Sequence, residues 1–114
     1  MKINTEDYSI VYNEETKTVS CQGSLRLSGM DGYRPIVQLL SDIAEQQPST
    51  ITLNVRELEF LNSSGINVLS KFVIKVRQQK NIQMTVKGSK EIPWQGKSLK
   101  NLQRLMPSLN LEWE

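Results

Sequence analysis

One stretch organises this chain, and it runs Leu58-Glu59-Phe60-Leu61-Asn62-Ser63-Ser64-Gly65-Ile66-Asn67-Val68-Leu69. The apolar run just before it, Ile51–Val55, predicts a strand, and the helical spacing after it predicts a helix with Ile66, Leu69, Phe72, Val73 and Val76 on one side. The turn between them places small polar residues at a helix N-terminus. There an Asn or Ser side chain can accept hydrogen bonds from free backbone N–H groups, and the partial positive charge favours an anion. Taken alone, such a turn indicates only a capped helix start.

Length and composition exclude several classes of protein. The 114 residues, 38% hydrophobic and 23% charged, predict a single globular domain spanning residues 1–114. A net charge of +2 is too small to indicate nucleic-acid binding by itself. No apolar run is long enough to cross a membrane, and the first residues lack the apolar core of a signal peptide. We therefore expect a cytoplasmic protein with no membrane insertion.

The chain has few of the side chains that enzymes use. It contains no His, so a Ser-His-Asp triad, a Cys-His dyad and the common zinc sites cannot form. Glycine-rich phosphate-binding motifs are also missing. We expect no catalytic residues, no metal and no cofactor; carboxylates such as Asp31, Glu57 and Glu59 leave an enzyme as the weaker alternative. The lone Cys21 is expected to be a small buried side chain in a reducing compartment.

The remaining segments alternate between strand and helix patterns. Strands are expected at Tyr8–Tyr12, Thr18–Gly23, Ile51–Val55 and Ile82–Val86, with an optional last strand at Leu109–Trp113. Helices are expected at Tyr33–Gln46, at Ser64–Gln79 and around Leu99–Met106, whereas Glu91–Gly96 is expected to be irregular. Pro35 suits the first turn of the first helix, and Asp31 could cap it. Strands separated by such helices predict a largely parallel sheet, to which the N-terminal hairpin adds an antiparallel pair.

The segment Val55–Leu69 resembles the signature of STAS domains, the family of bacterial anti-sigma factor antagonists. In that family a strand ending in an apolar residue runs into Asp-Ser-Ser/Thr-Gly, then an apolar residue and a helix. The order of elements along this chain is also similar to that of the family. The resemblance implies an α/β fold with a STAS-like mixed sheet of four to five strands, ordered β-β-α-β-α-β-α(-β), with helices mainly on one face.

The resemblance also implies a function. In STAS regulators the Ser after the Asp is phosphorylated by a partner kinase, and here that residue is Ser63. The chain would then be a non-enzymatic signal-transduction module that binds a serine kinase of anti-sigma factor type, or a related regulator, and switches partners to regulate transcription. Ser64 is expected to make a hydrogen bond at the helix start, and Gly65 to let the partner's backbone come close. The residues expected to contact the partner are Arg26, Leu61, Asn62, Ser63, Ser64, Gly65, Ile66 and Asn67.

Two departures from the family pattern leave an alternative open. Asn62 stands where the family has Asp, and Gly23-Ser24-Leu25-Arg26 stands where it usually has Gly-Glu-Leu-Asp. Asn62 can still cap the helix, while Arg26 reverses the local charge and either favours a bound phosphate or is simply an exposed cation. The alternative is a STAS-type scaffold or accessory subunit that is not phosphorylated and binds another regulator, a transporter ATPase or a small ligand.

Basic residues line the outer side of the second expected helix. They are a solvated face or a docking surface for an acidic partner, and they comprise Lys71, Lys75, Arg77 and Lys80. Nucleic-acid binding, which we do not expect, would rest on Lys71, Lys75, Lys97, Lys100 and Arg104. Tyr8–Tyr12 and Leu109–Trp113 are expected to be exposed end strands, so we expect a monomer or a weak dimer.

Overall fold

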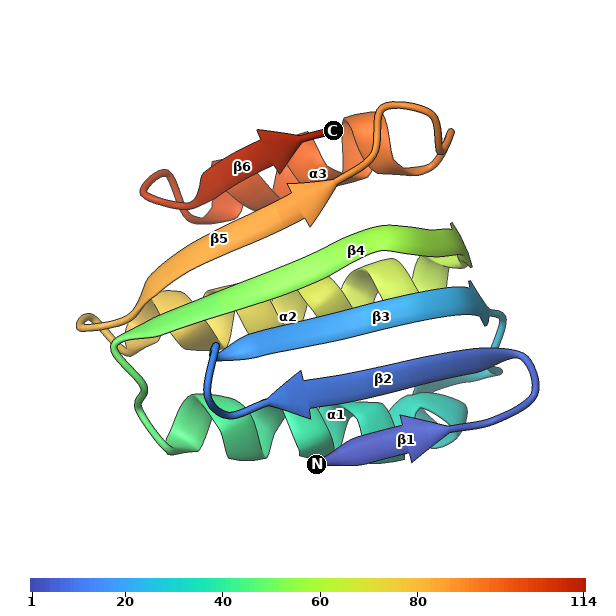
Figure 1. Ribbon diagram of the computed structural model, residues 1–114, viewed down its shortest axis with the longest axis horizontal. Helices are drawn as coiled ribbons and strands as arrows, with labels where there is room; N and C mark the ends of the chain where they lie inside the picture. Colours follow the sequence, from blue (N-terminus) through green and yellow to red (C-terminus); the bar gives the residue numbers. More distant parts are fainter.

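The computed structural model describes all residues, Met1–Glu114, as a sheet of six strands covered by three helices (Figure 1). The strands are β1 (Lys2–Asn4), β2 (Tyr8–Asn13), β3 (Thr18–Leu25), β4 (Thr50–Leu61), β5 (Gln83–Gly88) and β6 (Asn110–Trp113). The helices are α1 (Gly29–Glu45), α2 (Ser63–Gln78) and α3 (Gln95–Leu105). Strand order in the sheet follows the chain, from β1 to β6. The first two pairings are antiparallel and the other three are parallel, as expected for a hairpin followed by βαβ units.

The sheet has one strand more than the four to five expected. The additional strand is β1, a three-residue segment whose Ile3 is the only partly buried side chain, so it carries no detectable alternation. The optional last strand is present as β6. Because β1 pairs with β2, the expectation that Tyr8–Tyr12 is an end strand is wrong, and the two edges of the sheet are β1 and β6.

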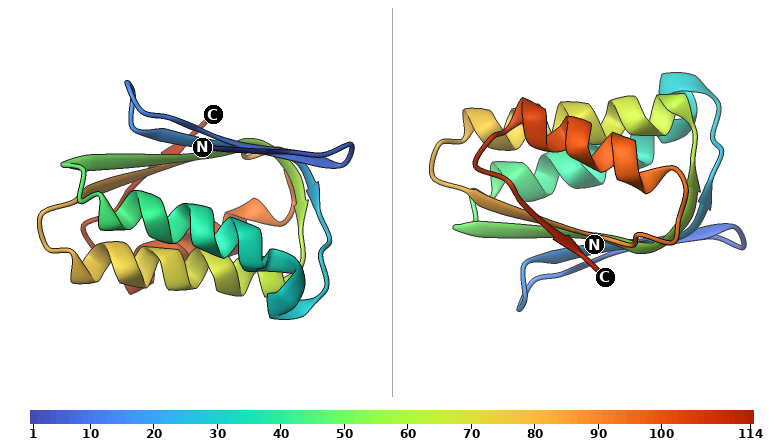
Figure 2. Two further views of the ribbon diagram at one scale, coloured as in Figure 1. Left: turned by 90° about the horizontal axis from the view of Figure 1, so that it is seen from below. Right: turned by 90° about the horizontal axis from the view of Figure 1, so that it is seen from above.

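All three helices lie on one face of the sheet, as Figure 2 shows from below and from above. Their apolar sides and the facing side of the strands enclose a core of 28 buried hydrophobic residues. The other face of the sheet is open to solvent. Parallel strands are usually covered on both faces, and their side chains are then buried on both. Here the burial of successive side chains alternates: in β5, Met84 and Val86 are buried while Thr85 and Lys87 are only half-buried. This alternation explains why the open face tolerates water.

Strand β4 is longer than expected, with 12 residues rather than the segment Ile51–Val55. Its alternation of buried residues is interrupted after Val55 and again after Leu58, and its register with β3 shifts at the same two places. A β-bulge inserts one extra residue into a strand, so a bulged strand loses its period of two. The second half of β4 therefore lacks the alternating pattern by which a strand is recognised in a sequence. The bulged strand continues to Leu61, just before α2.

The bulged part of β4 is held from the helix side by two side chains at the start of α3. Gln95 is fully buried; its Nε2 donates to the carbonyls of Val55 (2.6 Å) and Leu58 (3.2 Å), and its Oε1 accepts from the N–H of Ser89 (2.7 Å). The indole Nε1 of Trp94 also donates to the Leu58 carbonyl (2.8 Å). Buried backbone groups near the bulge thus find side-chain partners.

The ends of α1 and α3 differ from the expected ones. Helix α1 begins at Gly29 rather than Tyr33, so Pro35 lies beyond its first turn. Asp31 lies inside α1 and forms an ion pair with Arg34 (2.7 Å) instead of capping the helix. Helix α3 begins at Gln95, within the segment expected to be irregular. The ends of α2, in contrast, agree with expectation to within one residue.

Cys21 lies in β3 and is buried, as expected from the sequence. Burial raises the pKa of its thiol to about 12, so the thiol stays protonated near neutral pH. None of the helices combines the length and the hydropathy that crossing a lipid bilayer requires.

Candidate functional site

The turn between β4 and α2 is held in place by the side chain of Asn62. Its Oδ1 accepts hydrogen bonds from the N–H of Gly65 (2.9 Å) and from the hydroxyl of Tyr33 in α1 (2.6 Å). Its Nδ2 donates to the carbonyl of Leu27 in the β3–α1 connection (2.9 Å). One side chain therefore ties the start of α2 to α1 and to the segment that follows β3.

This network requires an amide rather than a carboxylate at position 62. Burial raises the pKa of the Tyr33 phenol, which stays protonated and donates to Asn62. A backbone N–H must face the amide oxygen and a backbone carbonyl must face the NH₂ group, so the partners fix which way the amide points. An Asp could still cap α2, but it has no hydrogen to donate to the Leu27 carbonyl. The Asn found here in place of the family's Asp thus has a structural reason.

Ser63 is the first residue of α2, and its side chain is exposed. The N–H groups of Gly65 and Ile66 are bonded to the side chain and the carbonyl of Asn62, each at 2.9 Å, whereas those of Ser63 and Ser64 have no acceptor. The Ser64 hydroxyl makes no hydrogen bond, so the expectation that it stabilises the helix start is wrong; Asn62 has that role. An exposed hydroxyl beside two free amides at a helix N-terminus is well placed to carry an anionic group.

Gly65 and Leu61 are buried, and they support the turn from inside. A Cβ atom on Gly65 would clash with the Leu61 side chain and lie 2.8 Å from the Tyr33 hydroxyl. Internal packing therefore explains the glycine, in place of the expected approach of a partner's backbone. Because they are buried, Leu61 and Gly65 are not accessible to a partner, unlike the exposed members of the predicted set.

Arg26 and Phe60 form an exposed pair at the same end of the sheet. The Arg26 guanidinium carbon lies 4.5 Å from the centre of the Phe60 ring, a cation–π arrangement, and Arg26 has no ion pair. Asn67 is exposed, while Ile66 is half-buried against the core. We call the exposed residues Arg26, Phe60, Ser63 and Asn67 the Ser63 surface. Phe60 was not among the predicted contact residues, although an aromatic side chain before the polar turn was a signal that could have identified it.

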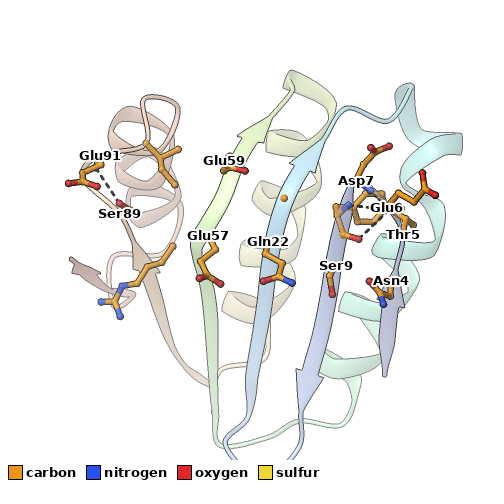
Figure 3. A pocket seen from close by; sticks show the side chains of 14 residues that line it. Asn4, Thr5, Glu6, Asp7, Ser9, Gln22, Glu57, Glu59, Ser89 and Glu91 are labelled. Carbon is orange, nitrogen blue, oxygen red and sulfur yellow. Dashed lines mark hydrogen bonds between the residues drawn. The ribbon is translucent and has the colours of Figure 1, made fainter.

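A second surface is the hollow on the open face of the sheet, with a volume of about 590 Å³ (Figure 3). Only two of its 14 lining residues are hydrophobic, and its only basic residue is Arg56, which donates to the Gly88 carbonyl (3.3 Å). Acidic side chains reach it from the β1–β2 loop, from β4 and from the loop after β5. They are Glu6, Asp7, Glu57, Glu59 and Glu91, and we call them the acidic hollow.

The acidic hollow has no signal in the sequence, because its residues come from three separate segments. The first bulge of β4 contributes to it: the alternation of Ile51, Leu53 and Val55 would bury position 57, but the extra residue makes Leu58 the next buried side chain and leaves Glu57 exposed in the hollow. No group of three or more His, Cys, Asp or Glu side chains converges in the geometry that a metal ion requires. The hollow is thus a broad polar surface that suits contact with cationic groups.

No established sequence family and no curated protein sequence matches this chain. Solved structures with the same fold do exist. A chain in the crystal structure of the diguanylate cyclase SiaD in complex with its activator SiaC, from Pseudomonas aeruginosa, is 11% identical with a TM-score of 0.73, and the match covers 100% of this chain and 99% of that one. SiaC of Pseudomonas aeruginosa alone is 11% identical with a TM-score of 0.70, covering 98% of this chain and 93% of that one.

A third solved structure is the Bacillus cell fate determinant SpoIIAA in its phosphorylated form. It is 17% identical with a TM-score of 0.58, and the match covers 91% of this chain and 89% of that one. Identities this low show the fold alone. The expected STAS-like α/β fold is therefore confirmed for this chain, with a sheet of six strands.

Proposed function

We propose that this chain is a non-enzymatic cytoplasmic regulator that binds a protein partner through the Ser63 surface and loses it when Ser63 is phosphorylated. The observation that supports this most is the exposed Ser63 hydroxyl at the first position of α2, beside the free amides of Ser63 and Ser64. The partner is a serine kinase of anti-sigma factor type or a related regulator. The kinase brings ATP and Mg²⁺, and this chain presents only the hydroxyl.

A phosphate on Ser63 is compatible with the fold. It adds a charge of about −1.5 to −2 at the positive end of α2, where free amides can donate to its oxygens. The hydrogen bonds of Asn62 do not involve the Ser63 hydroxyl, so they persist. A partner fitted to the neutral turn would instead meet a bulky dianion. A loss of only about 1.4 kcal/mol of binding free energy is tenfold in affinity, so this change is sufficient for a switch.

The solved structures with this fold support a regulatory role of this kind. SiaC is described as the activator of the diguanylate cyclase SiaD and forms a complex with it, and SpoIIAA has been solved in a phosphorylated form. Both are regulatory proteins, and together they combine protein partnering and phosphorylation on one fold. From these structures we infer for this chain a regulatory role that involves a protein partner, but not the identity of that partner.

The first test is the mass of the intact protein isolated from its native host, with mapping of any modified site. One phosphate on Ser63 is the expected result under at least one growth condition. Its absence under every condition, from protein recovered with its partner, would contradict the switch.

The second test compares the affinity of that co-purified partner for four forms of the protein. Ser63→Asp should weaken binding about tenfold or more, while Ser63→Ala should bind like the unmodified chain. The matched control is Ser108→Asp, which should have no effect. Ser108 is exposed and belongs to the connection between α3 and β6, and this connection lies at the opposite end of the sheet from the turn between β4 and α2 (Figure 1). Equal binding by all four forms would rule out switching at Ser63.

A second candidate function is a STAS-type scaffold or accessory subunit that is never phosphorylated and binds another regulator, a transporter ATPase or a small ligand. The observation that favours it is the Asn62 amide, which is committed to the Leu27 carbonyl and offers no carboxylate beside Ser63. This candidate predicts an unmodified Ser63 and a partner whose affinity depends on Arg26 and Phe60 but is indifferent to Ser63→Asp.

A further inference from the structure

A small apolar groove runs between α1 and α2 on the outer side of the helix layer. Its volume is about 100 Å³, roughly the volume that three molecules occupy in liquid water. This is enough room for one aliphatic side chain. Leu40, Val68 and Phe72 are buried and form its floor. We call this feature the α1–α2 groove; its lining is completed by Val37, Ser41, Lys71 and Lys75.

The basic residues beside the groove are available to a negatively charged partner. Lys71 is exposed and has no ion pair. Lys75 pairs with Glu45 at 3.4 Å, but the Glu45 side chain is 62% exposed, and such a surface pair contributes little and can exchange. Helices α2 and α3 contain no Asp or Glu, and their basic residues are Lys71, Lys75, Arg77, Lys97, Lys100 and Arg104. The groove thus has an apolar floor and, on its α2 side, a basic rim in which Lys71 has no acidic partner and Lys75 has only an exposed one.

The rim of the groove is continuous with the Ser63 surface. Ser63, Asn67, Lys71 and Lys75 follow one another at four-residue intervals, so they form a single ridge along α2. The first three are exposed. Eight residues of helix separate Ser63 from Lys71, which corresponds to about 12 Å. A partner that covers Ser63 therefore needs only two further helical turns to reach the groove.

We infer that the α1–α2 groove receives an acidic amphipathic helix of the regulatory partner. One Leu- or Ile-sized side chain of that helix enters the groove, and its flanking Asp or Glu side chains face Lys71 and Lys75, the mode in which amphipathic helices bind grooves. This inference rests on the proposed function for the existence of the partner. It also gives a physical reason for the switch. A phosphate on Ser63 places negative charge at the start of the ridge along which the acidic helix lies, and the two negative charges repel each other.

The inference can be tested with a defined peptide before any partner is known. The probe is a synthetic helix of roughly 18 residues with leucines on one side and glutamates on the other. The comparison peptide has lysines in place of the glutamates. Each peptide is titrated into the ¹⁵N-labelled full chain, and binding is monitored by NMR through changes in the amide chemical shifts. We expect the acidic peptide alone to shift the amide signals of Val37, Ser41, Val68 and Lys71.

Two variants and one control locate the peptide on the surface. Lys71→Glu should weaken binding of the acidic peptide about tenfold, and Ser41→Leu, which fills the groove, should weaken it similarly at unchanged charge. Lys100→Glu on α3 makes the same change in net charge away from the groove, and should weaken binding by about twofold or less. These three results together would show that the peptide binds in the groove and not at basic residues anywhere on the helices.

Three results would overturn the inference. They are no binding of the acidic peptide, equal weakening by Lys71→Glu and Lys100→Glu, or full binding to Ser41→Leu. The proposed switch is tested separately, by Ser63→Asp with the native partner. Groove binding with no effect of Ser63→Asp would retain the groove and reject the switch, whereas a Ser63-sensitive partner and no groove binding would do the reverse.

Discussion

Asn62 and Gln95 are two amide side chains that join neighbouring segments through backbone groups, and the sequence revealed only one of them. Asn62 caps α2 three residues further on, and it also reaches Leu27 and Tyr33. Gln95 is fully buried and bonds to Val55, Leu58 and Ser89. Each uses a donor and an acceptor at once, which no carboxylate or hydrocarbon of the same shape can do.

The difference between them lies in what each amide supports. Asn62 holds a turn whose other side is exposed, so the turn presents Ser63 while its base stays rigid. Gln95 is itself fully buried, and it holds a bulge inside the sheet through the carbonyls of the buried residues Val55 and Leu58. The same chemistry therefore supports a proposed site in one place and the strand that leads to it in the other. Substitutions at the two positions should therefore affect stability and partner binding differently.

The largest effect is expected from Gln95→Leu. The change removes all three hydrogen bonds and leaves the Ser89 N–H and the Val55 carbonyl unpaired, so it should cost about 3 kcal/mol or more of unfolding free energy. The matched control is Gln103→Leu, which loses one bond from a half-buried side chain to the Leu109 carbonyl and should cost about 1 kcal/mol or less. Urea unfolding measures both. A similar loss in the two variants would show that Gln95 is merely one more hydrogen-bonding residue.

Gly65→Ala should also destabilise the protein, by about 1–3 kcal/mol, because the new methyl group meets Leu61 and Tyr33. Gly96→Ala is its control, since α3 leaves open space around that position and alanine is the better helix former. The two changes should therefore have opposite signs in thermal unfolding. A neutral Gly65→Ala would mean that the packing beneath the Ser63 turn is loose.

Asn62→Asp is expected to cost about 1–2 kcal/mol at neutral pH. The carboxylate still caps α2, but it faces the Leu27 carbonyl without a hydrogen to donate. Asn62→Ala should cost about 1 kcal/mol more, since the cap is lost as well. Asn81→Asp adds the same charge at an exposed position after α2 and should be nearly neutral. If Asn62→Asp were as stable as the unaltered chain, the amide donor would not be the reason for Asn at this position.

The smallest effect on stability is expected from Arg26→Ala, at about 0.5 kcal/mol or less, because an exposed cation–π pair contributes little. The same variant should weaken partner binding measurably, since Arg26 belongs to the Ser63 surface. Arg34→Ala, which breaks an exposed ion pair in α1, is the control and should leave binding unchanged. A large loss of stability in Arg26→Ala would assign the residue to the fold rather than to recognition.

The elements that could be predicted are those with local signals. Helix α2 shows an unbroken period of buried residues and a polar cap, and it was predicted to within one residue at each end. Strand β1 and the second half of β4 were missed, because one is too short to alternate and the other is bulged. In the candidate site, Ser63 and Asn62 follow from the local motif. Phe60 and the acidic hollow do not, since they depend on which strands are neighbours.

By itself, the sequence determined the α/β class, the order of most elements and the presence of a polar turn before α2, because apolar periodicity and turn chemistry act over short stretches of chain. Only the tertiary structure decided which side of that turn is exposed, why position 62 is an amide, and where Lys71 meets an apolar groove. These properties depend on contacts between segments far apart in the chain. Such contacts arise only when the sheet is assembled and the helices pack onto a single face of it.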